Sequence, residues 1–243
     1  MNNEELKTLA EQLRQPDGLK GIEIADNMNE TNSKMTFHSI DHLDISNNDH
    51  ILELGHGNCK HLSYVLKQKN KLTYYGLEIS ELMNNEAKRV NQRFIEGKQA
   101  LFYMYDGQNI PFEDNHFDKI FTVNTIYFWT DPKLLLAELF RVLKPNGILN
   151  ITFAQQDFME QLPFTQFSFT LYDNKKINQL IDTTPFQTVG SDTQTETIKS
   201  KTGDIVNRDF TTIILTKYPN CQSSRRLRPK IGRSSPLVII SVC

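Results

Sequence analysis

The sequence predicts an α/β protein built on a doubly wound, mainly parallel sheet of about seven strands with an antiparallel last strand. Three observations lead to this fold class. Strand-like apolar runs alternate with helical patterns between residues 51 and 153. The first run, Ile51–Leu54, leads directly into two glycines, Gly55 and Gly57. The first three strands each carry an acid at or near the carboxyl end, and parallel strands bring these ends to one edge of the sheet.

Composition is that of an ordinary globular protein. The 243 residues are 38% hydrophobic, which is enough for one large domain with a full core. The start of the chain has no apolar stretch of signal-peptide length, and no run of 18 or more apolar residues occurs. Three scattered cysteines suit a reducing compartment. We therefore expect a cytoplasmic protein without a membrane span.

Charge is unevenly distributed along the chain. The whole sequence carries a net charge of −2, but residues 219–243 contain five cations and no acid, so residues 1–218 carry −7. A body this acidic is a poor electrostatic partner for nucleic acid. The sequence predicts three parts: an N-terminal helical or lid segment (1–45), a main domain (46–218) and a basic, disordered tail (219–243).

The N-terminal segment is predicted to hold two helices, at 3–15 and at about 31–43. The Asn-rich stretch Asp26–Asn32 between them is too polar for a core. It is predicted to be an exposed linker, or alternatively a lid that closes over a binding site.

The turn after Ile51–Leu54 has the features of a nucleotide-like cofactor site. Gly55 and Gly57 permit positive φ and let a ligand approach the main chain, and the following helix would offer free N–H groups. A dinucleotide fingerprint needs a third glycine where this chain has Lys60, which argues against NAD. Glu78 closes the next strand 21 residues after Gly57, where a carboxylate can accept hydrogen bonds from a ribose diol, or else cap a helix.

Glu53, Gly55 and Gly57 match a known pattern of an acid followed by glycines at alternate positions. The motif resembles the first motif of class I S-adenosylmethionine (SAM) dependent methyltransferases, with Cys59 in place of the usual third glycine. The run LLLAELFRVLKPNGILNITF, residues 134–153, is similar to small-molecule methyltransferases of type 11. The resemblance implies a Rossmann-like fold with SAM as cofactor.

The resemblance also implies the cofactor-binding residues. Asp106, at the end of the third strand, corresponds to the acid that accepts a hydrogen bond from the adenine amino group, although Asp-Gly is also common in turns. The implied set is Glu53, Gly55, Gly57, Asn58, Glu78, Ile79, Asp106, Gly107 and Asn124.

Aromatic residues are the candidates for holding the methyl acceptor. Tyr127 and Trp129 follow the strand 117–123 and are predicted to face the sulfonium, or else to be core. Phe164 and Phe167 belong to an aromatic stretch, 158–172, that either lines an apolar acceptor pocket or packs as core. The catalytic base is undetermined, with His56 and Tyr127 as weak candidates.

No metal site is predicted, because His38 and His42 stand apart in the sequence from any carboxylate–thiol cluster with ligand spacing. The predicted function is methyl transfer from SAM to a small-molecule acceptor. Two alternatives remain open: a SAM-binding protein without catalysis, and a nucleotide-dependent oxidoreductase. The sequence leaves the oligomeric state open.

Overall fold

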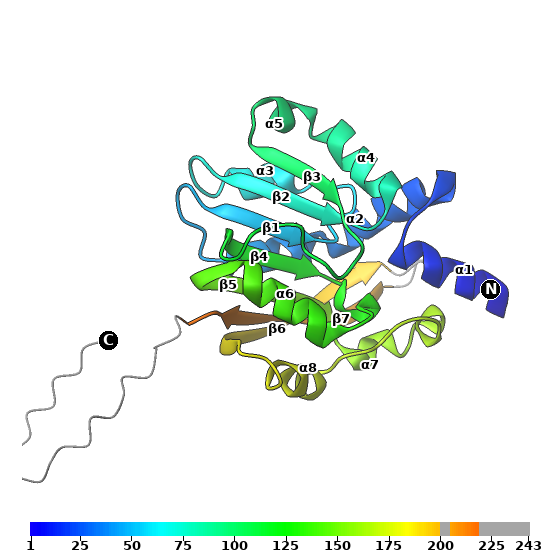
Figure 1. The fold of residues 1–243 in the computed structure, drawn as a ribbon. Coiled ribbons are helices and arrows are strands. Elements are labelled where there is room, and N and C mark those ends of the chain that lie inside the picture. Colours follow the sequence, from blue (N-terminus) through cyan, green and yellow to red (C-terminus); the bar gives the residue numbers. More distant parts are fainter. Residues whose placement is uncertain (200–204, 219–243) are drawn as a thin grey trace, which may run out of the picture.

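The computed structural model describes residues 1–199 and 205–218. They form a 7-stranded sheet in the order β3-β2-β1-β4-β5-β7-β6, with helices on both faces (Figure 1). The first five strands are parallel, and β7 runs antiparallel to both β5 and β6. The strands are β1 (His50–Leu54), β2 (Thr73–Glu78), β3 (Ala100–Met104), β4 (Phe117–Val123), β5 (Leu143–Ala154), β6 (Gln187–Lys199) and β7 (Ile205–Thr216). The predicted fold class is confirmed.

Each face of the sheet has its own hydrophobic cluster. Helices α6 and α8 cover one face, where their leucines and isoleucines pack against β4, β5 and β7. Helices α2, α3 and α4 cover the other face. Helices α3 and α4 pack against β1, β2 and β3, and α2 lies against β4, β5 and β7. The helical elements are α1 (Asn3–Arg14), α2 (Gly18–Asp41), α3 (Leu62–Leu66), α4 (Glu81–Val90), α5 (Gln92–Glu96), α6 (Pro132–Val142), α7 (Gln156–Met159), α8 (Asn174–Ile181) and the 3₁₀ turns η1 (Ile126–Phe128) and η2 (Pro163–Gln166).

Local sequence signals place several of these elements as predicted. Asp131 caps α6 by accepting hydrogen bonds from Lys133 and Leu134, with Pro132 in the first helical turn. Strand β4 occupies the predicted residues 117–123, and α1 differs from its predicted range by one residue at the end. The inward-facing side chains of α6, Leu135, Leu139 and Val142, are buried.

Helix α2 corrects one prediction. The stretch Asp26–Asn32 is not a linker, because the helix runs through it without a break for 24 residues. Tertiary contacts outweigh its low helix propensity. The buried guanidinium of Arg208 donates to the carbonyl of Thr31 and to Oδ1 of Asn32, while it pairs with the buried Glu196 at 2.6 Å.

The helix that follows the glycine turn is shorter and later than predicted. Turns occupy residues 57–61, and α3 spans only five residues from Leu62. Cys59, at the position of the usual third glycine, adopts a φ of 49°. Helices α4 and α5 are separated at Asn91, whose side chain donates to the carbonyls of Cys59 and Ala87. Helix dipole effects at the glycine turn are therefore weak, because five residues give a small dipole.

Among residues 1–199 and 205–218, no helix is long and apolar enough to cross a bilayer. The basic tail predicted at 219–243 lies outside the described residues.

Candidate cofactor and acceptor site

The carboxyl ends of β1, β2, β3 and β4 meet at one edge of the sheet, on the right of Figure 1. Gly55 there has a φ of 70°, and its N–H donates to the carbonyl of Leu77 at 2.8 Å. A Cβ on Gly55 would lie 2.4 Å from Cγ2 of Thr125. Gly57, at a φ of 55°, has no atom within 4 Å of the corresponding position. The turn is therefore packed at its first glycine and open at its second.

Glu78 lies at the end of β2, as predicted, but its carboxylate is buried and turned toward the main chain. One oxygen accepts the N–H of Gly57 at 2.9 Å. The other accepts the N–H groups of Ile79 at 2.8 Å and Ser80 at 3.0 Å. A carboxylate offers about four acceptor positions, so three are used by the backbone. Glu78 therefore fixes the glycine turn against the end of β2.

The prediction that Glu78 binds a ribose stays a prediction. Only one acceptor position of the carboxylate is left for a ribose hydroxyl.

Asn58 and Lys60 connect the glycine turn to α2. Nδ2 of Asn58 donates to Oδ1 of Asp26 at 2.9 Å, and Nζ of Lys60 lies 2.6 Å from the same oxygen. Asp26 belongs to the stretch for which the sequence left a linker or a lid open. The contact of Asp26 with the glycine turn favours the interpretation of this stretch as a lid.

Asp106 and Gly107 follow β3 and lie beside the end of β2. The carboxylate of Asp106 is exposed and accepts the N–H groups of Gln108 and Asn109, and the Asn109 amide lowers the pKa of Asp106. A Cβ on Gly107 would lie 3.5 Å from Cγ2 of Ile79. Ile79 and Gly107 are therefore neighbours, as the predicted cofactor set requires.

Glu53 is buried beneath the glycine turn in a hydrogen-bonded group with three other side chains. Its Oε2 accepts from Nε2 of His61 at 2.7 Å and from the hydroxyl of Tyr74, and Cys59 contacts the same tyrosine hydroxyl. Burial by itself lowers the pKa of His61, but the neighbouring Glu53 charge raises it well above the ordinary value. Glu53 thus supports the turn from below.

Asn124 follows β4 at a φ of 58° and connects several elements. Its Oδ1 accepts the hydroxyl of Tyr127 at 3.0 Å, and its Nδ2 faces the thioether of Met35 on α2 at 3.5 Å. A thioether is a weak acceptor, so the Asn124 amide is able to donate to a ligand. The Tyr127 hydroxyl also accepts the N–H of Ala154, and burial raises the pKa of Tyr127. Tyr127 therefore fixes the end of β5, and its hydroxyl is poorly suited to act as a catalytic base.

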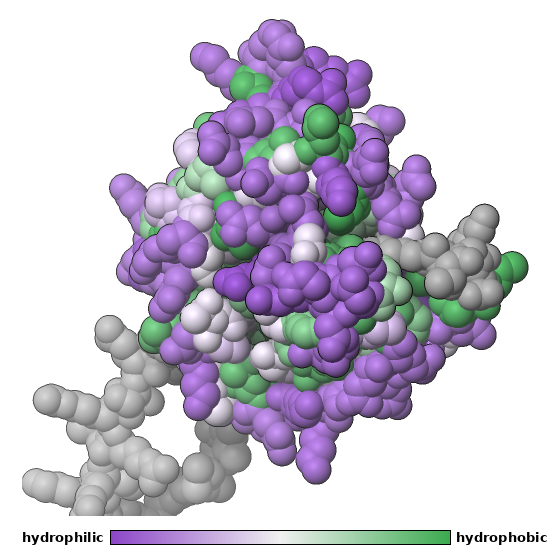
Figure 2. Space-filling model, turned by 90° about the vertical axis from the view of Figure 1, so that its right-hand side faces the viewer, coloured by the Kyte–Doolittle hydropathy of each residue, from purple (hydrophilic) through white to green (hydrophobic). Residues whose placement is uncertain are grey.

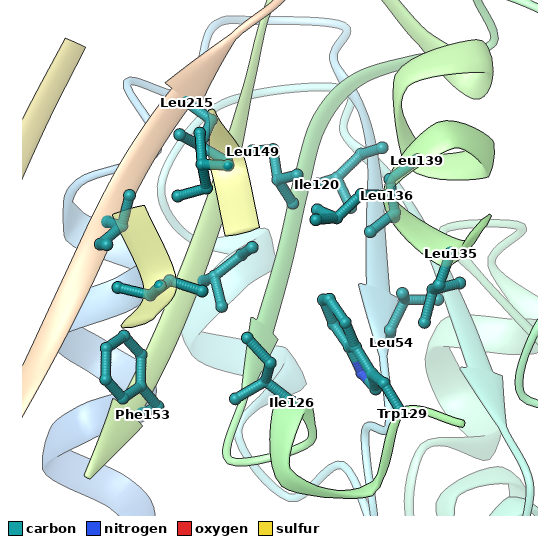
Figure 3. Packing of buried hydrophobic residues seen from close by; sticks show 14 of the residues in the cluster. Leu54, Ile120, Ile126, Trp129, Leu135, Leu136, Leu139, Leu149, Phe153 and Leu215 are labelled. Atoms are coloured by element: carbon teal, nitrogen blue, oxygen red, sulfur yellow. The ribbon is translucent and has the colours of Figure 1, made fainter. Parts of the chain in front are cut away.

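The structure places Trp129 in the core, 8% exposed, among Leu54 and Leu136 (Figure 3). Its Nε1 donates to Oγ1 of Thr125 at 3.1 Å. Thr125 is also the residue that packs against Gly55. Of the two roles that the sequence left open for Trp129, this packing favours core over contact with the acceptor.

The aromatic stretch forms a cover at the same edge of the sheet. Phe169 packs on Phe128 with ring centroids 4.6 Å apart and on Phe164 at 5.8 Å, and Phe167 is half-buried. The turn η2 within the stretch lies against α1 (Figure 1). The face toward which the carboxyl ends point is mostly hydrophilic with separate apolar patches (Figure 2).

His56 is buried under the glycine turn. Its Nδ1 donates to the carbonyl of Gly57 at 2.7 Å, and its ring packs edge-on against Phe102. A Cβ on Gly76 would lie 2.6 Å from Cδ2 of His56. Burial lowers the pKa of His56, so the ring is neutral. These contacts favour the alternative that His56 fills space below the turn.

The structure brings together most of the predicted cofactor set at one edge and adds residues that sequence reasoning missed. Asp26 and Thr125 contact the glycine turn directly, and Gln15 donates to the carbonyl of Ile79 at 3.0 Å. No local signal identifies Gln15 or Asp26, because each meets its partner only through the tertiary fold. Thr125 follows a strand end, and its position could have been singled out.

Known proteins share this domain. Residues 52–151 match a family described as a methyltransferase domain. The methyltransferase YrhH of Bacillus subtilis is 34% identical over 108 residues, which cover 44% of this chain and 59% of that protein. A fatty-acid O-methyltransferase of Mycolicibacterium smegmatis is 31% identical over 106 residues, 43% of this chain and 37% of that protein. This chain therefore spans less than two thirds of either relative.

A solved geranyl diphosphate methyltransferase in complex with SAM has the same fold, with a TM-score of 0.62 and 11% identity over 76% of this chain and 84% of that one. Residues 52–151 are thus a methyltransferase domain, and the chain has the fold of class I SAM-dependent methyltransferases. The family expected from the glycine motif is confirmed, and with it SAM as the cofactor of the family.

Replacing Gly57 by alanine tests whether the open side of the turn receives the cofactor. Gly18 is a matched control, because its φ of 63° and its empty surroundings are the same but it begins α2. Each change should cost about 1–2 kcal/mol of backbone strain. Only Gly57→Ala should also weaken SAM binding in a calorimetric titration. Equal SAM affinity in the two variants would show that the ligand does not approach this glycine.

Glu78→Ala should lower the free energy of unfolding as well as SAM affinity. It leaves three backbone N–H groups without their acceptor, which should cost about 1–3 kcal/mol. The exposed Glu81 in the first turn of α4 provides a control, and its alanine variant should stay within about 0.5 kcal/mol of the parent protein. Urea denaturation measures both. A Glu78→Ala protein as stable as the parent would refute the supporting role of this carboxylate.

Proposed function

We propose that this protein transfers the methyl group of SAM to a small acceptor with a largely apolar body and a carboxylate at the reacting end. The observation that carries the proposal is the open glycine turn at Gly57, flanked by Glu78 and by the Ile79–Gly107 contact. These are the positions at which the fold presents backbone and acid groups to a nucleoside.

In this proposal, different residues at the sheet edge bind different parts of the cofactor. SAM supplies an electrophilic methyl on a sulfonium. Glu78 has one acceptor position left for a ribose hydroxyl, and the exposed Asp106 has room to accept the adenine amino group. Asn124 is placed at the end of β4, with its amide donor facing only a thioether.

The need for a base distinguishes among acceptors. Among the described residues, the two candidate bases, His56 and Tyr127, are buried. Nδ1 of His56 donates to the carbonyl of Gly57 and its Nε2 has no partner, while the Tyr127 hydroxyl bonds to Asn124 and to the main chain of Ala154. A phenol or an alcohol must lose a proton during transfer, whereas a carboxylate is already ionised at neutral pH. Alignment of the acceptor behind the methyl group and exclusion of water are then sufficient. The amide of Asn124 could orient one carboxylate oxygen.

The cover over the edge supports an apolar body for the acceptor. Phe169 packs on Tyr127 and Phe128, which follow β4, and Phe164 packs on Phe169. Phe167 is half-buried in the same stretch. Net charge of −7 on residues 1–218 disfavours nucleic acid. The relative named as a fatty-acid O-methyltransferase combines the same two features in its substrate, an apolar chain and a carboxylate.

Helix α2 acts as the lid in this proposal. It is bound to the glycine turn through Asp26 and to the sheet through Arg208. The pair Asp26–Lys60 is half-exposed, so it is weak enough to open for cofactor exchange. A nucleotide-dependent oxidoreductase is disfavoured, since Lys60 stands where a dinucleotide site needs glycine.

Transfer of a labelled methyl group from SAM to long-chain fatty acids tests the proposal. The parent protein should form base-labile methyl esters, and Phe167→Ala should raise KM for the acceptor roughly five- to thirtyfold with SAM affinity unchanged. Phe140→Ala is the matched control, because Phe140 is equally half-buried but packs on Phe186 away from this edge. It should leave KM unchanged.

Two results would contradict the account. Label in phenolic lipids or RNA, but not in fatty acids, would refute the carboxylate acceptor. SAM binding with no transfer to any acceptor would favour the non-catalytic alternative.

A further inference from the structure

A cluster of two histidines and one aspartate connects α2 to strand β6, away from the glycine turn. His38 lies in the last turn of α2 and His42, four residues later, is the C-cap of the helix, so the two rings lie on the same side, with centroids 4.2 Å apart. Nε2 of His38 lies 2.8 Å from Oδ2 of Asp192, and Nε2 of His42 lies 3.7 Å from the same oxygen. One ligand atom from each side chain lies within 4.8 Å of the other two. The sequence offers no carboxylate–thiol cluster at ligand spacing from these histidines, but the fold brings the carboxylate of Asp192 to them.

The protons of His42 can be assigned from its partners. Its Nδ1 lies 2.8 Å from the main-chain carbonyl of His38, which can only accept, so Nδ1 carries the proton. In the neutral ring, Nε2 is then a bare lone pair that faces the carboxylate of Asp192. Two electron-rich groups do not attract each other. A positive charge between them, either a proton or a metal ion, removes the conflict.

His38 is held in a way that suits either occupant. Its Nδ1 lies 2.9 Å from the hydroxyl of Thr212, and that hydroxyl is 2.8 Å from the hydroxyl of Thr152. Both threonines can turn their protons, so Thr212 is able to accept from Nδ1 and donate to Thr152. Without an ion, Nε2 of His38 donates to the carboxylate of Asp192, which can only accept, and Nδ1 accepts from the hydroxyl of Thr212. When an ion takes Nε2, the proton moves to Nδ1 and Thr212 accepts it. Second hydrogen bonds of this kind orient the histidine ligands of metal sites.

We propose that His38, His42 and Asp192 bind a divalent transition-metal ion of the zinc class. Two imidazoles and one carboxylate are ligands that zinc accepts, with a fourth position left for water. The side chains are 14%, 35% and 38% exposed, so an ion can reach them from solvent. Ligand atoms around tetrahedral zinc are roughly 3.3 Å apart. Binding requires His38 to withdraw slightly from Asp192 and His42 to approach it.

A second group of potential metal ligands in the described residues already has its hydrogen bonds made. Glu53, Cys59 and His61 also lie close together, but they are buried and form hydrogen bonds with one another and with Tyr74. No lone pair there faces a like group without a proton between them. The Glu53 group is therefore stable without an ion, whereas a cation would relieve the repulsion between His42 and Asp192.

A bound ion would restrict the movement of helix α2, which is the proposed lid. Its ligands connect the C-terminal half of α2 to β6, while Asp26, near the other end of the helix, contacts the glycine turn. Fixing α2 on the sheet would therefore favour the closed arrangement of the cofactor site. The binding of the metal itself does not depend on the proposed methyl transfer.

Titration of the untagged, chelator-treated full chain with Co²⁺ tests the site, with zinc as the competitor. The visible spectrum should show one equivalent of bound Co²⁺ that zinc displaces, without a thiolate charge-transfer band. His42→Ala and Asp192→Asn should each weaken binding by at least about tenfold. His50→Ala is the matched control, because His50 is a half-buried histidine that stacks on Tyr75 outside the cluster, and it should bind Co²⁺ like the parent protein.

Zinc should also raise the melting temperature of the parent protein and of His50→Ala, but not of the two cluster variants. Asp192→Asn keeps the shape of the side chain, and circular dichroism confirms that it folds. The proposal is overturned if the parent protein binds no Co²⁺ saturably, if both cluster variants bind it as tightly as the parent, or if the spectrum shows thiolate ligation at Cys59.

Discussion

The carboxylate of Glu78 is the constraint on which the candidate site depends. It accepts N–H groups from Gly57, Ile79 and Ser80, and so joins the turn after β1 to the end of β2. Without this carboxylate, the three N–H groups would lose their acceptor, at a cost of about 1–3 kcal/mol. Because the turn is fixed in this way, Gly57 can hold its left-handed conformation with open space beside it. The cofactor edge is thus formed before any ligand binds.

Helix α2 is the second organising element, and it relates the N-terminal segment to the chemistry of the edge. Along its length, it contacts the glycine turn through Asp26 and the buried Arg208 through Thr31, and further on His38 meets Thr212 and Asp192. The amide of Asn150 on β5 also donates to the helix, at the carbonyl of Ser39. A shift in the position of the C-terminal half of this single helix would therefore also move Asp26 relative to the glycine turn. In this arrangement, a metal at one end and a cofactor at the other would influence each other.

Sequence patterns predicted the features that depend on neighbouring residues. The end of β2 at Glu78, strand β4 and the cap of α6 by Asp131 each follow from local periodicity or capping, and each is confirmed. Contacts between distant residues could not be read in this way. His38 and Asp192 are 154 positions apart, and Arg208 stabilises an Asn-rich helix from 177 positions away. The choice between core and pocket for Trp129 also required the fold, because aromatic residues after a strand suit both.

The central claim is that the edge formed by Gly57, Glu78 and Asp106 binds SAM. The most direct measurement is the melting temperature of the full chain with SAM, S-adenosylhomocysteine or NAD, each added at increasing concentration. SAM and S-adenosylhomocysteine should both raise it, and a hundredfold excess over Kd should stabilise the fold by about 2.7 kcal/mol. NAD should leave it unchanged. A shift with NAD, and none with either sulfur compound, would contradict the account.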